Sequence, residues 1–77
     1  MMQDRCDPWA KLYLQRQNKI GNRNVWLYLI SSAIGNFAVV DYEMPGMEIK
    51  RRLFEENYDK AESYFESVSR RMVSGKL

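Results

Sequence analysis

The chain has 77 residues, enough for one small domain whose single core is only just sufficient for stability. Hydrophobic residues make up 45% and charged residues 29%, which excludes an intrinsically disordered chain. The formal net charge of +2 is too small to indicate nucleic acid, a membrane or an acidic partner by itself.

The single cysteine, Cys6, excludes a disulfide framework and a zinc cluster. Small secreted domains usually carry several disulfides, so we expect a cytoplasmic protein. The N-terminal residues mix both charge signs without an apolar run, which excludes a signal peptide. The longest apolar run, residues 25–30, is too short to cross a bilayer, so no membrane partner is expected.

The sequence predicts one α+β domain over residues 1–77. It contains a four-stranded antiparallel β-meander followed by one C-terminal helix packed on one face. The expected segments are an irregular lead-in, the meander and the helix, at residues 1–10, 11–54 and 57–75.

The first expected strand covers residues 11–17 and is followed by a turn over residues 18–23. Residues 25–31 and 37–43 form an apolar hairpin around Ile34-Gly35-Asn36. The tripeptide Ile-Gly-Asn also occurs at residues 20–22, which predicts the same turn chemistry in both hairpins.

Residues 47–54 could form a fourth strand or the first part of a helix. Met47, Ile49 and Leu53 alternate with charged residues, as in a half-buried edge strand. One helix from residue 47 to residue 74 would be unusually long for so small a domain. We therefore predict a strand here.

The final segment has helical periodicity. Its apolar residues recur every three or four positions, at Tyr58, Ala61, Phe65, Val68 and Met72. Asn57 is the expected N-cap and Gly75 can end the helix.

This helix can cover only one sheet face, and we expect it to contact Val25, Leu27 and Leu29. We place Ala38 with the residues of the other face. Three alternatives stay open for covering that face: the sheet curls on itself, the lead-in with Met1, Met2 and Trp9 folds over it, or a partner binds. The predicted partner-binding residues are Trp26, Tyr28, Ile30, Val40 and Tyr42.

Basic residues concentrate in the first half of the chain. Between Pro8 and Val40 there is no acidic residue. Basic side chains interleaved with aromatic rings are typical of nucleic-acid contacts, whereas the alternative is that they protect edge strands from aggregation. The residues predicted to contact nucleic acid are Lys11, Arg16, Lys19, Arg23, Trp26 and Tyr28.

No catalytic constellation is present. Histidine is absent, which removes the commonest general base and most zinc sites. Asp41, Glu43 and the run Glu48-Ile49-Lys50 could in principle hold Mg²⁺ in a nuclease, but acids beside a turn are normally solvated. We therefore expect no enzyme activity, no cofactor, no metal site and no small-molecule substrate.

Read in order, the chain resembles the WGR domain family. An aromatic strand follows a loop in YLQRQNKIGNRNVWLYLI, and the closing segment carries Phe54, Ala61, Phe65, Arg71 and Gly75 at comparable spacing. The resemblance implies this family's fold over residues 11–77. It also implies a role in DNA-end contact and interdomain signalling, as in DNA-damage-responsive poly(ADP-ribose) polymerases.

The signature itself differs. Where the family has Arg-Trp-Gly-Arg-x-Gly, this chain has Asp41-Tyr42-Glu43-Met44-Pro45-Gly46, so only an aromatic residue and the last glycine are kept. The carboxylates at this position would repel phosphate.

The sequence therefore predicts a small non-enzymatic interaction module. It would bind a protein or form a homodimer through the uncovered sheet face or an edge strand. The alternative is a WGR-like module that binds nucleic acid through its basic first hairpin.

Overall fold

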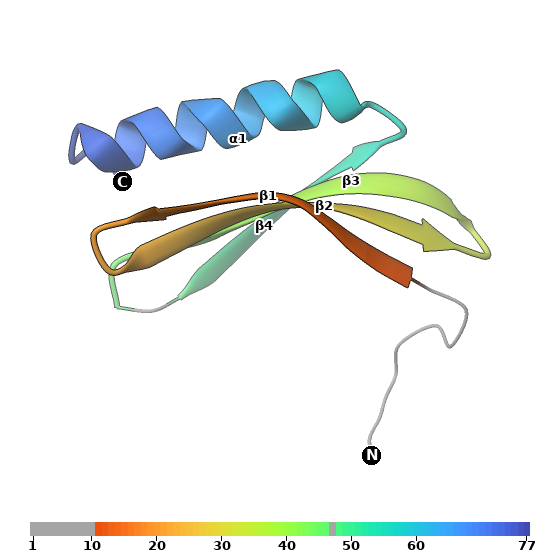
Figure 1. Ribbon diagram of the computed structural model, residues 1–77, viewed down its shortest axis with the longest axis horizontal. Coiled ribbons are helices and arrows are strands. Elements are labelled where there is room, and N and C mark those ends of the chain that lie inside the picture. Colours follow the sequence, from red (N-terminus) through yellow and green to blue (C-terminus); the bar gives the residue numbers. More distant parts are fainter. Residues whose placement is uncertain (1–10, 47) are drawn as a thin grey trace, which may run out of the picture.

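A computed structural model describes residues 11–46 and 48–77. It has four strands, β1 (Lys11–Ile20), β2 (Arg23–Ser32), β3 (Gly35–Glu43) and β4 (Ile49–Glu55), and one helix, α1 (Tyr58–Val73). The strands pair antiparallel in the order β1-β2-β3-β4 (Figure 1). The predicted α+β fold is confirmed, while the expected lead-in over residues 1–10 lies outside the described residues.

The first hairpin turn is shorter than predicted. β1 continues to Ile20 instead of ending at Gln17, and β2 starts at Arg23. Only Gly21 and Asn22 remain in the turn. Gly21 has a φ of 65°, the positive region that the first position of a type II′ hairpin turn requires.

The second hairpin does not repeat this arrangement, so the prediction of one turn chemistry used twice is wrong. Its turn residues are Ala33 and Ile34, whereas Gly35 already begins β3. The cause is the strand register: Ser32 pairs with Gly35 and Leu27 with Val40, which keeps apolar residues of both strands on one face.

The prediction of a strand rather than a helix before α1 is confirmed. β4 pairs with β3 from Glu55 opposite Phe37 to Ile49 opposite Glu43. Glu56 then takes a φ of 49°, an uncommon value for a residue other than glycine. This backbone turn redirects the chain from the sheet edge into α1 (Figure 1).

Local signals position α1 as expected. The side chain of Asn57 accepts a hydrogen bond from the backbone N–H of Lys60 at 3.1 Å, which satisfies one donor of the first turn. Arg70 and Arg71 lie in the last turn, where cations oppose the helix dipole. Gly75 follows with a φ of 77°.

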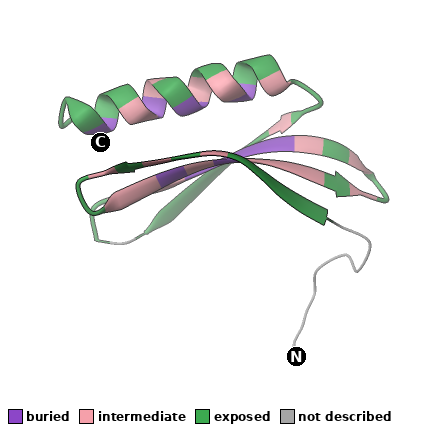
Figure 2. Cartoon of the chain, in the orientation of Figure 1, coloured by how far each residue is buried: buried purple, intermediate pink, exposed green. Residues whose placement is uncertain are grey.

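The core lies between α1 and one face of the sheet. Val25 and Leu27 are buried against the helix as predicted, and Leu29 packs at the edge of the cluster. Figure 2 shows that buried segments occur on α1 and along the middle of the sheet. The remaining buried residues of this cluster are Ala38, Val40, Ala61, Phe65, Val68 and Met72.

Polar contacts link α1 to the edge strand β1. Arg16 donates to Glu66 at 3.0 Å and to Glu62 at 3.4 Å, and its guanidinium lies 4.9 Å from the ring centre of Phe65. The hydrogen bond that Arg16 donates to Glu66 is the main cause that raises the pKa of Arg16. Asn18 adds a hydrogen bond of 3.1 Å to Ser69. These contacts therefore tie α1 to the edge strand β1 through two residues, Arg16 and Asn18.

The sheet is open, because β1 and β4 each pair with only one neighbouring strand. The sheet therefore does not close on itself, so of the three covers considered for its second face a closed barrel is not observed, and a cover by the lead-in lies outside the described residues. Four strands joined only to their sequence neighbours leave two edges, which a closed barrel would have to pair. No helix in the described part of the chain is both long and apolar enough to cross a bilayer.

We expect Phe65→Ala to destabilise the fold by about 3 to 5 kcal/mol, because Phe65 is fully buried at the centre of the core. A domain of this size has only about 3 to 5 kcal/mol from a single core, so the variant should be largely unfolded by circular dichroism and urea titration. Val73→Ala on the same helix, at an exposed position, is the matched control and should change stability by less than about 0.5 kcal/mol. A cooperative, near wild-type unfolding curve for Phe65→Ala would contradict this assignment of the core.

Candidate interaction surface

The face of the sheet opposite α1, here called the open face, is divided into an apolar half and a polar half. In antiparallel sheets directly paired residues point to the same side, so the register assigns each side chain to a face. The apolar half lies towards the β2–β3 turn. Its apolar side chains are Leu12, Leu14, Tyr28, Ile30, Phe37, Val39 and Leu53, and Glu55, opposite Phe37, adds one carboxylate at its end.

A β-bulge in β1 contributes to this arrangement. Leu14 pairs with Tyr28 on the open face, whereas Arg16 pairs with Leu27 on the helix face. Residues two apart in a regular strand point to the same side, so the extra residue Gln15 is what separates them. One strand thus presents leucines to the open face and a guanidinium to the helix.

The apolar half has a buried centre and an exposed periphery. Val39 is fully buried although no helix covers it, because side chains of β2 and β4 surround it. On the outer strands Leu14 is 52% exposed and Leu53 is 57% exposed. No residue in the described parts of the chain lies over this patch, since α1 is on the other side (Figure 1). Contiguous apolar surface of this kind marks interaction sites.

The polar half is internally hydrogen-bonded. Arg51 donates to both carboxylate oxygens of Asp41, at 2.7 and 2.8 Å. Glu43 accepts two hydrogen bonds from Asn24, from the backbone N–H at 2.7 Å and from the side-chain amide at 3.1 Å. The other side chains of this half are Gln17, Lys19, Trp26 and Ile49.

These hydrogen bonds also bear on the Mg²⁺ alternative. Asp41 and Glu43 do share a face, as the sequence indicates, but each is occupied by a neighbouring donor. Across the described residues no three acidic or sulfur side chains are grouped closely enough to hold a metal ion.

Of the predicted partner-binding residues, Trp26, Tyr28 and Ile30 lie on the open face. Val40 and Tyr42 do not. Val40 pairs with Leu27 and is fully buried in the core, and the Tyr42 hydroxyl lies 3.3 Å from the hydroxyl of Tyr64 on α1. Ala38 is corrected in the same way, because its partner in β2 is Leu29.

The predicted nucleic-acid residues are not brought together. Lys11, Arg16 and Arg23 are on the helix face by register, whereas Lys19 is on the open face with Trp26 and Tyr28. Arg16 binds two helix carboxylates, and Arg23 donates to the carbonyl oxygen of Leu77. The two-residue period of a strand and the bulge in β1 distribute these bases over both faces.

Several residues of the open face were missed from sequence. Phe37, Val39 and Leu53 alternate with helix-facing residues, so their period was visible, but the face of each set depends on register. Leu12 and Leu14 also alternate with helix-facing residues, but the bulge after Leu14 separates their period from that of Arg16 and the rest of β1.

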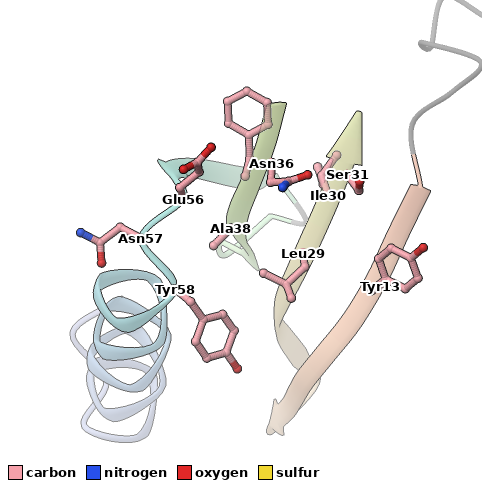
Figure 3. A pocket seen from close by; sticks show the side chains of 10 residues that line it. Tyr13, Leu29, Ile30, Ser31, Asn36, Ala38, Glu56, Asn57 and Tyr58 are labelled. Carbon is pink, nitrogen blue, oxygen red and sulfur yellow. The ribbon is translucent and has the colours of Figure 1, made fainter. Parts of the chain in front are cut away.

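A groove of about 500 Å³ lies on the helix face of the sheet, where α1 begins. Tyr13 from β1 and Tyr58 from α1 stand on opposite sides of it, with Leu29 and Ala38 between them (Figure 3). Its walls are mixed, because the polar residues Ser31, Asn36, Glu56 and Asn57 also line it, and its lining offers Glu56 no basic side chain as an acid–base partner.

Comparison with known protein families, with characterised proteins and with solved structures found no match for this chain. The WGR resemblance therefore stays a prediction from the sequence.

Two tyrosines of the sheet, Tyr28 and Tyr42, have raised pKa values, which makes the stability of the fold depend on pH. Burial is the main cause that raises the pKa of Tyr28, the charge of Asp41 raises it further, and Arg51 opposes the shift. The pKa of Tyr42 is raised first by its hydrogen bond to Tyr64 and then by burial. In both cases folding favours the neutral phenol.

We expect the free energy of unfolding to fall as pH rises above about 10, because the unfolded chain then loses tyrosine protons before the folded chain does. This contribution is complete below the ordinary tyrosine pKa and is lost as pH passes the raised one. Urea titrations at increasing pH measure it, and Tyr28→Phe and Tyr42→Phe should each flatten the curve. An alkaline slope identical in all three proteins would contradict the coupling.

The Asp41–Arg51 pair gives a second prediction. Arg51→Met should destabilise the fold by about 1 to 2 kcal/mol, because the Asp41 carboxylate, in a residue only 7% exposed, would lose its charged partner. Lys50→Met is the control, since Lys50 forms only a 3.5 Å surface pair with Glu48, worth less than about 1 kcal/mol. Equal urea midpoints for the two variants would show that the Asp41–Arg51 pair does not contribute to the stability of the fold.

Proposed function

We propose that this protein is a non-enzymatic interaction module that binds another protein through the apolar half of its open face. The observation that carries the proposal is the contiguous set of seven apolar side chains with no described residue over it. Burying a leucine side chain is worth about 1.5 to 3 kcal/mol, so covering Leu14 and Leu53 would contribute strongly to binding.

The composition of the open face supports a protein as the partner. Protein interfaces combine an apolar centre with a polar rim and are enriched in aromatic residues and arginine. Here Tyr28 and Phe37 lie in the apolar half, and Trp26 and Arg51 lie in the adjoining polar half. Because Arg51 is already bonded to Asp41, docking over this pair would not bury an unpaired guanidinium or carboxylate there.

The nucleic-acid alternative has less support. Binding single strands requires cations along the backbone path beside exposed rings. Lys19 is the one base of the predicted set that shares a face with Trp26, and the acids Asp41 and Glu43 lie on that face too.

A cytoplasmic location, suggested by the single cysteine, belongs to the proposed function as a whole.

The test compares two double variants that each replace two exposed apolar residues by lysine. Leu14→Lys/Leu53→Lys alters the open face, whereas Tyr13→Lys/Val73→Lys alters exposed positions on the helix face and at the helix end. Proteins retained by the immobilised wild-type chain are purified and their affinity is measured by calorimetry. We expect the open-face variant to bind at least about 10-fold more weakly, a loss of about 1.4 kcal/mol.

The control double variant should bind such a protein as tightly as the wild type does. If the two variants bind equally well, the open face is not the binding surface. Circular dichroism of each variant verifies that the fold is kept, as expected for substitutions at exposed positions.

A further inference from the structure

We propose that the partner is a second copy of this chain, with the two open faces packed together about a two-fold axis parallel to the strands. The inference rests on the proposed function and specifies its partner. It would produce four layers, helix–sheet–sheet–helix, from two molecules.

The first reason is that β2 and β3 are apolar on both sides. Val40 and Val39 are neighbours in β3, both are fully buried, and they point to opposite faces. Strands of this kind are typical of sheets covered on both faces. The helix provides one cover, and an identical sheet, packed at the usual separation of about 10 Å, would provide the second.

The second reason is that the open face complements itself. A two-fold axis along the strands places β1 over β4 and β2 over β3 of the second copy, and keeps each row of paired residues over itself. Leu14, Tyr28, Val39 and Leu53 form one row. Leu14 would then face Leu53 of the second copy, and Tyr28 would face Val39, both apolar pairs.

The third reason is charge. In this orientation no two like charges face each other, although each copy has five charged side chains on the open face. Arg51 faces Gln17, Asp41 faces Trp26, and Glu43 faces Asn24. The two remaining charges face apolar residues at the rim, Lys19 opposite Ile49 and Glu55 opposite Leu12. Like charges in contact would cost several kcal/mol, so their absence makes the orientation feasible.

The fourth reason is area. With strands about 4.8 Å apart and a rise of about 3.3 Å per residue, the four-stranded face covers on the order of 500 Å² in projection, and side chains increase the accessible area. Specific interfaces begin at about 600 Å² per partner. An axis perpendicular to the strands would superpose only the two apolar halves and leave the polar rows unpaired. The parallel axis therefore uses the whole face and predicts a dimer at the small end of stable interfaces.

The test is sedimentation velocity of the full chain over concentrations from about 1 to 500 μM. We expect a reversible monomer–dimer equilibrium within this concentration range, because weak and transient interfaces are found at the small end of the size range. Leu14→Lys/Leu53→Lys should weaken the dimer at least 30-fold, whereas the control Tyr13→Lys/Val73→Lys, at exposed positions away from the open face, should leave the constant within about 3-fold.

A charge exchange tests the orientation. Leu14→Lys and Leu53→Glu should each weaken the dimer when present alone. Combined in one chain they should restore it, because each introduced ammonium faces an introduced carboxylate of the second copy. Within one chain the two positions are three strands apart, about 14 Å, so an intramolecular ion pair cannot explain the rescue.

Each outcome decides between the alternatives. A strict monomer at every concentration overturns the second copy as the partner. If another protein still binds the wild type and binds Leu14→Lys/Leu53→Lys more weakly, the proposed function stands. Failure of both overturns both. If Leu14→Lys/Leu53→Lys leaves the dimer intact, the open face is not the dimer interface. If both single substitutions weaken the dimer and their combination does not restore it, the two-fold axis is not parallel to the strands. If circular dichroism shows that Leu14→Lys/Leu53→Lys is unfolded, Leu14→Ala/Leu53→Ala is measured in its place.

Discussion

The pairing of β2 with β3 is the constraint on which the rest of the structure depends. Leu27 opposite Val40 and Tyr28 opposite Val39 place apolar residues on both sides of the same two strands. One set forms the floor of the core beneath Phe65, and the other forms the centre of the open face. A shift by one residue would exchange the two sets and remove the match to the helix. The core and the candidate interaction surface therefore depend on a single register.

The two faces of the sheet use charge differently. On the helix face Arg16 bridges β1 to two carboxylates of α1, which ties the helix to an edge strand. On the open face Arg51 lies flat beside Asp41 and links neighbouring strands β3 and β4. Neither guanidinium extends freely from the sheet. Much of the basic charge that is conspicuous in the sequence is thus used for internal structure.

The period of hydrophobic residues was enough to predict the number, order and type of the elements, because alternation in residues 25–30 and helical spacing from Tyr58 onward are local signals. It was not enough to assign Val40 or Tyr42 to a face. Each strand has two alternating sets, and only the pairing between strands decides which set meets Trp26. The ion pair of Asp41 with Arg51 was hidden for the same reason, since it joins residues ten apart through register.

The bulge at Gln15 determines where the length of β1 can vary. Leu14 and Arg16 already point to opposite sides, as adjacent residues do in a regular strand. Loss of Gln15 would therefore join them in regular alternation and leave every side chain on its present face. An insertion or deletion of one residue between Leu12 and Leu14, or between Arg16 and Asn18, would instead move the residues on one side of it to the opposite face. Gln15 is therefore a point at which β1 can change in length and still present the same surface.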